Sequence, residues 1–149
     1  MKYRSTKRWG HDQGLSTAFR QWRADSHCHF VHGYSIGVKF TFEADELDYR
    51  NWVVDFGDLK ELKAKVQDLF DHKTVVAEDD PQLEWFQQAE EKGILELTIL
   101  PTVGCEAFAE HIFHMAVDYL NEKGYSPRAR LVSVEVSEHE GNSALVVAE

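Results

Sequence analysis

The sequence predicts a single α+β domain, built as a four-stranded antiparallel sheet with two helices on one of its faces. Hydrophobic and polar residues alternate from Ile36 to Glu43, which is typical of a half-buried strand. Hydrophobic residues recur at intervals of three and four over residues 58–70 and 106–121, which is typical of amphipathic helices. Because strands are expected on both sides of these helices, the predicted order is strand, strand, helix, helix, strand, strand.

The N-terminal third of the chain is expected to supply two strands of this sheet. The first covers Tyr3–Trp9 and the second covers residues 31–44. Between them, Leu15–Trp22 is expected to form a short helix or a lid over a site. A polar turn over residues 46–51 and a short apolar run, Trp52–Phe56, then lead into the first helix.

The first helix is predicted over residues 58–70, with Asp58 as its N-cap, and it ends at Asp71-His72. Five further elements are predicted after it: a helical piece at Gln82–Glu91, a short strand at Ile94–Leu100, the second helix at Glu106–Asn121, and two last strands at 131–136 and Ala144–Val147. A sheet covered on one side only has an open face and free edges. We therefore expect a homo-oligomer in which other subunits cover them.

The composition is that of an ordinary globular domain, with 43% hydrophobic and 28% charged residues in a chain of 149. No run approaches the roughly 18 apolar residues of a membrane span, and the N-terminus shows no apolar signal region, so no membrane partner is expected. Two widely separated cysteines make no disulfide framework, which favours a reducing cytoplasm. The net charge of −10 argues against nonspecific binding to nucleic acid.

The positive charge is concentrated near the N-terminus. Against a single acid, Asp12, the first 23 residues hold six cations: Lys2, Arg4, Lys7, Arg8, Arg20 and Arg23. A local basic face on an acidic protein suits a small polyanion such as a phosphate ester, because Arg and Lys pair with phosphate oxygens. Equally, these cations could pair with acidic segments elsewhere in the fold or in a neighbouring subunit.

The stretch Ser26–Tyr34 holds three of the eight histidines and one of the two cysteines: His27, Cys28, His29 and His32. Imidazole and thiolate side chains bind metals such as zinc and move protons near neutral pH. Positions two apart share a face of a strand, so the side chains of His32 and Tyr34 are expected to point together. The alternative is a histidine-rich turn with one buried cysteine.

Other residues suit acid–base chemistry less specifically. Asp71-His72 closes a helix, where a carboxylate could orient an imidazole, although a solvated helix end explains the dipeptide as well. Glu138 follows a predicted strand and could bind two N–H groups of a heterocycle, or be one of many surface acids. The histidines around Cys28 would favour its thiolate, whereas Cys105, at a helix start, is better explained as a buried small apolar residue.

Five segments in order resemble the 6-pyruvoyltetrahydropterin and 6-carboxytetrahydropterin synthase family. They cover most of the chain from residue 28 onward: Cys28–Gly33, Val54–Lys60, Asp71–Lys73, Cys105–Ala109 and Val134–Glu138. The resemblance implies the tunnelling fold (T-fold), in which subunits join their sheets into a barrel, usually as a hexamer of two trimers. It also implies a zinc-dependent lyase that acts on 7,8-dihydroneopterin triphosphate.

The resemblance also implies roles for individual residues. Cys28 corresponds to the proton-abstracting thiolate, and Asp71 with His72 to the other half of the proton relay. Glu138 corresponds to the residue that anchors the pterin ring, assisted by Glu106. The basic N-terminal segment is a plausible seat for the triphosphate.

The zinc ligands depart from the family pattern, which has one histidine after the first strand and two in a His-Gly-His motif. His32 is present, but Tyr34 stands where the last ligand is expected. His11 is the only histidine available upstream. We predict zinc bound by His11, His32 and His27, with His29 or Tyr34 as alternatives to His27; loss of the metal is the competing hypothesis.

The three-residue gap between Cys28 and His32 resembles the compact motif of the bacterial 7-deazaguanine (queuosine) pathway enzymes. It favours 6-carboxytetrahydropterin synthase activity, with release of acetaldehyde and triphosphate. The alternatives are 6-pyruvoyltetrahydropterin synthase activity and a non-catalytic oligomer that binds pterins or purines.

Overall fold

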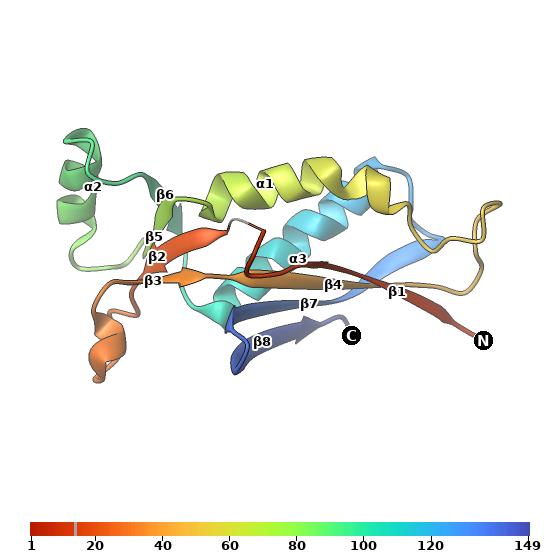
Figure 1. Ribbon diagram of the computed structural model, residues 1–149, viewed down its shortest axis with the longest axis horizontal. Helices are drawn as coiled ribbons and strands as arrows, with labels where there is room; N and C mark the ends of the chain where they lie inside the picture. The colour runs from red at the N-terminus through yellow and green to blue at the C-terminus, as the bar shows by residue number, and fades with distance from the viewer. Residues whose placement is uncertain (14) are drawn as a thin grey trace.

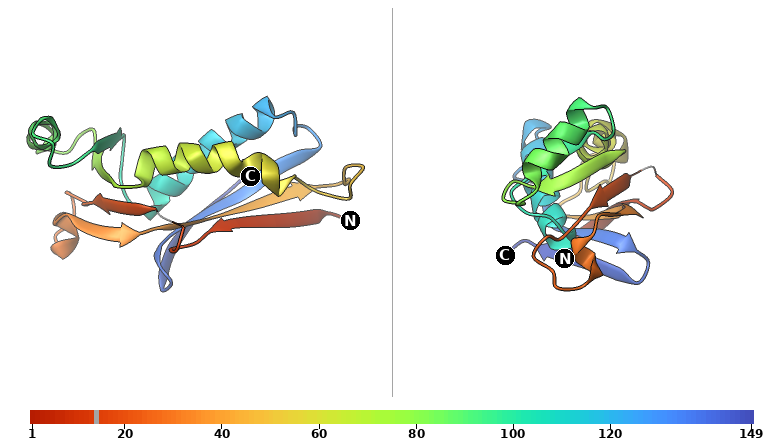
Figure 2. Two further views of the ribbon diagram at one scale, coloured as in Figure 1. Left: turned by 45° about the horizontal axis from the view of Figure 1, so that its top comes forward. Right: turned by 90° about the vertical axis from the view of Figure 1, so that its left-hand side faces the viewer.

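The structure is a computed structural model that describes residues 1–13 and 15–149 (Figure 1). Its longest helices are α1 (Lys60–Phe70) and α3 (Cys105–Glu122), and both cover the same face of an antiparallel sheet (Figures 1 and 2). A shorter helix, α2 (Leu83–Glu91), lies at the end of the molecule that also carries a second sheet. None of the described helices is both long and apolar enough to cross a membrane.

The first sheet confirms the predicted four antiparallel strands. Its order is β1-β4-β7-β8, with bounds Tyr3–Trp9, Gly37–Ala44, Ala129–His139 and Asn142–Val147. In β4 the alternation works as predicted, since Phe40 and Phe42 are fully buried while Lys39 is exposed. They join Phe108 and Ile112 of α3 in one core, so the sheet and its covering helices are held together by apolar burial.

A second four-stranded sheet was not predicted. Its order is β3-β2-β5-β6, with bounds His32–Ser35, Ser16–Phe19, Lys73–Ala77 and Leu97–Leu100; β2 pairs antiparallel with β3 and parallel with β5. The expected helix or lid at Leu15–Trp22 is therefore wrong. Leu15, Thr17 and Phe19 are buried and Ser16 is exposed between them, which is a strand pattern too short to recognise in the sequence.

The predicted strand over residues 31–44 is divided between the two sheets. β3 ends at Ser35 and β4 begins at Gly37, so the histidine-rich segment belongs to the second sheet and the apolar alternation to the first. Phe19 of β2 packs edge-on against Phe108 of α3, with ring centroids 5.0 Å apart. The second sheet therefore shares the core of the first.

The start of α1 differs in detail from the prediction. A single 3-10 turn, Phe56–Leu59, precedes the helix, and the carboxylate of Asp55 rather than Asp58 caps this turn by accepting a hydrogen bond from Gly57 N at 2.8 Å. Asp58 has another partner, because its Oδ2 accepts a hydrogen bond from the Tyr125 hydroxyl at 2.5 Å. The other predicted helices, 82–91 and 106–121, agree with α2 and α3 to within one residue at each end.

Candidate functional site

A cavity of about 740 Å³ lies where β3, the start of α3 and the β7–β8 turn meet. Four of the predicted site residues line it: Cys28, His32, Glu106 and Glu138. We call it the Cys28–Glu138 cavity. Among the described residues that line it there is no Lys or Arg, so its ionisable groups are thiols, carboxylates, one imidazole and one phenol.

Cys28 is held at the mouth of this cavity by its backbone. It sits in a 3-10 turn, His27–His29, whose cap Ser26 accepts a hydrogen bond from Cys28 N at 3.4 Å. On the other side, Gln21 N donates to the Cys28 carbonyl at 3.0 Å. The side chain of Cys28 itself is free and exposed. A thiol fixed in this way can reach a ligand in the cavity without rearrangement of the turn.

His32 and Tyr34 point the same way from β3, as predicted. The Nδ1–H of His32 donates to the carbonyl of Phe30 at 2.8 Å, and this fixes the ring so that Nε2 is an acceptor. The hydroxyl of Tyr34 donates to that Nε2. Burial raises the pKa of Tyr34, and the nearby Glu138 carboxylate and Cys28 raise it further, so Tyr34 stays a neutral phenol at physiological pH.

Two carboxylates face the cavity from different elements. Glu138 lies near the end of β7, and its Oε1 accepts a hydrogen bond from Asn142 Nδ2 at 2.9 Å across the β7–β8 turn. Glu106 is in the first turn of α3. Gly104 precedes the helix with φ +118°, a backbone angle that favours glycine, and it leaves this helix start open to the cavity.

Cys105 also lines the cavity but is half-buried. Burial raises the pKa of its thiol to about 11, with the negative charges of Glu138 and Glu106 as further causes. Cys105 therefore remains protonated at neutral pH, in agreement with its predicted role as a small apolar residue. Of the two cysteines, Cys28 is the exposed one.

Asp71 and His72 form the predicted carboxylate–imidazole pair but lie away from the cavity. Asp71 Oδ1 is 2.9 Å from His72 Nδ1 and also accepts a hydrogen bond from Ser16 N at 3.2 Å. His72 has φ +58°, in the left-handed region of the backbone. The side chains of these two adjacent residues contact each other in this backbone conformation. Neither residue is among those that line the Cys28–Glu138 cavity, and the imidazole is exposed to solvent.

The predicted zinc ligands are not brought together. His11 donates through Nδ1 to the carbonyl of Ser35, and neither His11 nor His27 lines the cavity that contains His32. Within residues 1–13 and 15–149, no group of three or more His, Cys, Asp or Glu side chains could hold a metal ion. The Nε2 that His32 would offer to a metal is hydrogen-bonded to the hydroxyl of Tyr34, whereas Nε2 of His11 is buried and has no hydrogen-bond partner among the described residues. The ligand set His11, His27 and His32 is therefore not assembled in this structure.

Comparison with known proteins identifies the family of this chain. The sequence pattern of the family described as 6-pyruvoyl tetrahydropterin synthase matches residues 11–149, which is nearly the whole chain. The chain belongs to this family. Two curated relatives are named 6-carboxy-5,6,7,8-tetrahydropterin synthase: the protein of Rickettsia typhi is 35% identical over 57 residues, and that of Rickettsia conorii 32%. The match covers 38% of this chain and 41% of each relative.

Solved structures show the same fold. A crystal structure of the uncharacterized protein WS1659 from Wolinella succinogenes superposes with a TM-score of 0.85 at 18% identity, and covers 100% of this chain and 99% of its own. The 6-pyruvoyl tetrahydropterin synthase of Plasmodium falciparum gives a TM-score of 0.70 at 15% identity, with 97% and 96% covered. These likenesses establish the T-fold of this 6-pyruvoyl tetrahydropterin synthase family member.

Two residues of the cavity were not predicted as site residues. Asn142 orients Glu138, and the sequence indicated only that it belongs to a turn. Tyr34 was considered only as an alternative metal ligand, yet it occupies the metal-binding nitrogen of His32. Their spacing from the predicted residues, four after Glu138 and two after His32, is the signal that could have identified them.

Proposed function

We propose that this protein is a lyase that converts 7,8-dihydroneopterin triphosphate and one water to 6-carboxytetrahydropterin, with release of acetaldehyde and triphosphate. The observation that carries the proposal is the meeting of Cys28, Glu106 and Glu138 in one cavity from three separate parts of the chain. Family membership and the names of the curated relatives favour this reaction. Such a product would belong to 7-deazaguanine biosynthesis.

The carboxylates suit the pterin ring. A pterin carries adjacent ring and exocyclic N–H donors, and Glu138 can accept both in two parallel hydrogen bonds. Asn142 already holds one oxygen of Glu138, so the carboxylate is oriented before the ligand arrives. A cavity of about 740 Å³ is in the range of small-molecule sites.

The chemistry begins with removal of a proton from the pterin side chain. Cys28 is proposed as the base, because its thiol is exposed to the cavity whereas the thiol of Cys105 is held protonated by burial. Tyr34 donates to His32, so its oxygen can accept a hydrogen bond from a hydroxyl of the substrate side chain. This contact would orient the substrate hydroxyl beside Cys28.

Asp71 and His72 are proposed to act on the cavity of a neighbouring subunit. The pair is preformed and exposed, and it is separate from the Cys28–Glu138 cavity of its own chain. Assembly of the predicted homohexamer would bring such a surface pair to another copy. No step is assigned to zinc, because the histidines predicted to bind it do not share a cavity.

A non-catalytic pterin-binding oligomer is the second candidate. The observation that favours it is that the described residues contain no cluster of three histidines that could hold a metal. Incubation with 7,8-dihydroneopterin triphosphate, with products identified by mass, separates the possibilities. We expect the carboxy product. The pyruvoyl product would change the assigned reaction, and bound but unconverted substrate would support the binding protein.

The role of Cys28 has a matched control in the same cavity. Cys28→Ala should lower the rate by about 10²–10⁴-fold, the usual contribution of a general base. Cys105→Ala should retain most of the activity, because that thiol is protonated throughout. Turnover by Cys28→Ala at the parental rate would remove Cys28 from the mechanism.

A further inference from the structure

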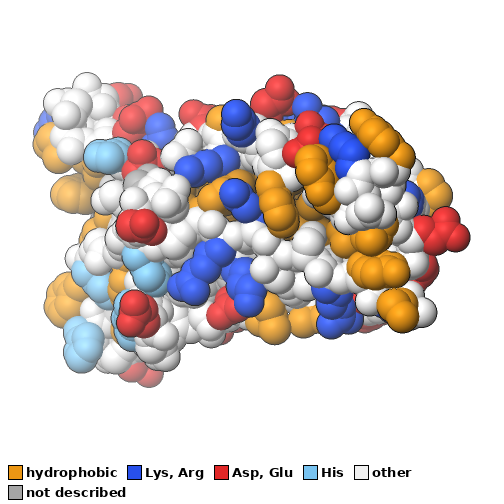
Figure 3. All heavy atoms as spheres, turned by 45° about the vertical axis from the view of Figure 1, so that its right-hand side comes forward, with side chains coloured by type: hydrophobic (Ala, Val, Ile, Leu, Met, Phe, Trp, Pro, Cys, Tyr) orange, Lys and Arg blue, Asp and Glu red, His pale blue; other side chains and the backbone are white. Residues whose placement is uncertain are grey.

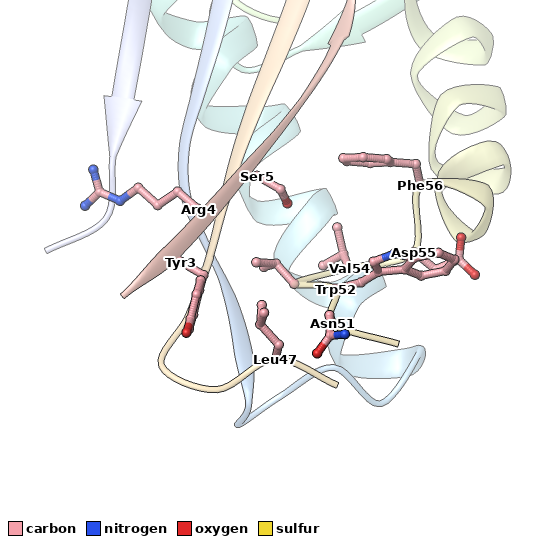
Figure 4. A pocket seen from close by; sticks show the side chains of 10 residues that line it. Tyr3, Arg4, Ser5, Leu47, Asn51, Trp52, Val54, Asp55 and Phe56 are labelled. Atoms are coloured by element: carbon pink, nitrogen blue, oxygen red, sulfur yellow. The ribbon is translucent and has the colours of Figure 1, made fainter. Parts of the chain in front are cut away.

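A second pair of cavities lies along β1 and shares no lining residue with the Cys28–Glu138 cavity. One, of about 500 Å³, is mainly apolar and includes Tyr3, Trp52 and Phe56 in its wall (Figure 4). The other, of about 470 Å³, is lined by four cations: Lys7, Arg8, Lys60 and Lys63. Phe56 belongs to both walls, so the two cavities adjoin. We call them together the basic–aromatic groove.

The cations of this groove differ from the others near the N-terminus. Lys2 and Arg4 pair with Glu43, Arg20 pairs with Asp80, and Arg23 with Asp79, which accounts for four of the six. In the described part of the chain, Lys7, Arg8, Lys60 and Lys63 have no carboxylate within 4.0 Å: Lys7 lies 5.7 Å from the centre of the Phe56 ring, and Lys63 donates to the neutral Gln13.

Lys7, Lys60 and Lys63 are the cations that this groove can use, because Arg8 alternates with Lys7 along β1, pairs with the exposed Lys39 and lies on the opposite face of the sheet. Three cations without carboxylate partners stand out in a protein with a net charge of −10. Lys60 and Lys63 are three residues apart on α1 and therefore share a helix face, which here turns toward β1. Figure 3 shows Lys and Arg side chains gathered beside hydrophobic ones on this side of the molecule. Because like charges held together repel, the arrangement suits a ligand with several negative charges, such as a chain of phosphates.

The apolar cavity of the basic–aromatic groove indicates which chemical group the phosphates of the ligand are attached to. The side chains of Trp52 and Phe56 are 44% and 46% exposed. The Arg50 guanidinium lies over the Trp52 ring, 4.4 Å from its centre, so the surface free for stacking is that of Phe56 and the part of Trp52 that Arg50 leaves uncovered. Ser5 points toward the same cavity (Figure 4), and its hydroxyl has no hydrogen-bond partner among the described residues. A planar ring with polar edges would fit between these side chains.

We infer that the basic–aromatic groove binds a nucleoside polyphosphate, with the base against Trp52 and Phe56 and the phosphates on Lys7, Lys60 and Lys63. The positive charge of the lysines calls for a ligand with phosphates. Because Phe56 lines both cavities, one molecule can occupy the apolar cavity and the basic cavity together. This site is separate from the Cys28–Glu138 cavity, so it does not depend on the proposed reaction.

Calorimetric titration of the full-length chain with ATP, inorganic triphosphate and adenosine tests the inference. We expect ATP to bind at least tenfold more tightly than triphosphate, and adenosine to bind more weakly than either. ATP affinity should also fall with added salt, because the contacts are largely electrostatic. Triphosphate binding as tight as that of ATP would overturn the assignment of the aromatic half, and no saturable ATP binding would overturn the site.

Amino-acid substitutions test where ATP binds. Lys60→Ala combined with Lys63→Ala should weaken ATP binding at least tenfold, and circular dichroism should show that the variant is folded. Lys65→Ala is the matched control, because its ammonium lies over the ring of Tyr119 and outside the groove. Equal affinity in the double variant and the parent would contradict the inference, as would loss of ATP binding in Glu138→Gln, which would place ATP in the other cavity.

Discussion

The Cys28–Glu138 cavity and the basic–aromatic groove have opposite electrostatic character in one small domain. The first is lined by two carboxylates and two cysteines, with no Lys or Arg among the described residues of its wall. The second is lined by Lys7, Lys60 and Lys63, which have no carboxylate partners in the described structure. Carboxylates select N–H donors, and cations select phosphate oxygens. Each region is therefore suited to a different chemical group.

This difference bears on how a pterin triphosphate would bind. The ring can be held by Glu138, but the Cys28–Glu138 cavity offers its triphosphate no cation. Two carboxylates beside three phosphates would instead repel them. We expect the triphosphate to extend out of the cavity, where side chains of a neighbouring subunit can meet it. Recognition within one chain would then depend mainly on the ring.

Among the effects on binding, the largest is expected from neutralising Glu138, the proposed anchor of the pterin ring. Glu138→Gln replaces a charged acceptor by an amide and should weaken binding of 7,8-dihydroneopterin, which lacks the triphosphate, by about 10–150-fold, corresponding to roughly 1.5–3 kcal/mol for a hydrogen bond to a charged group. Fluorescence titration of the pterin measures it. Glu135→Gln, on the same strand but outside this cavity, is the control. Unchanged affinity in Glu138→Gln would separate Glu138 from pterin binding.

The long elements of the fold could be predicted from the sequence, and the short ones could not. β4 and α3 are long enough for their periodicity to be read directly. β2 has four residues, and β5 (Lys73–Ala77) is buried almost throughout, so neither shows a readable alternation. Their pairing joins residues more than 50 positions apart, and local patterns contain no information about it. The second sheet was missed for this reason.

For the site, residue types were predictable but ring orientations were not. The resemblance to the family indicated Cys28, Glu106 and Glu138, and the structure brings these three together. The direction of the His32 ring depends on the carbonyl of Phe30 and on the Tyr34 hydroxyl, which spacing does not specify. A metal site requires several side chains to converge within a few ångströms, so it is the part of a site most sensitive to such local contacts.

An intermediate effect is expected for metal content. The parent protein, purified with zinc present, should contain well below one zinc per chain, because Tyr34 occupies Nε2 of His32. Tyr34→His removes that hydroxyl and adds an imidazole beside His32 and Cys28, a set that resembles catalytic zinc sites. Its zinc content, measured by plasma mass spectrometry, should approach one per chain. Stoichiometric zinc in the parent that disappears in His32→Ala would show instead that the native site binds metal.

The smallest expected effect lies outside both cavities and concerns stability at low pH. Glu43 is buried on the first sheet, where the hydrogen bond from Arg4, assisted by Arg130 and Lys2, lowers its pKa from 4.5 to about 2 despite burial. The stability that this charge contributes is complete above pH 4.5, and it is lost progressively as the pH falls from 4.5 toward 2. Thermal unfolding midpoints should therefore fall between pH 5 and pH 3 by a few degrees more in the parent than in Glu43→Gln, with Glu46→Gln behaving like the parent. Parallel pH profiles for the parent and Glu43→Gln would show that these ion pairs add nothing to folding.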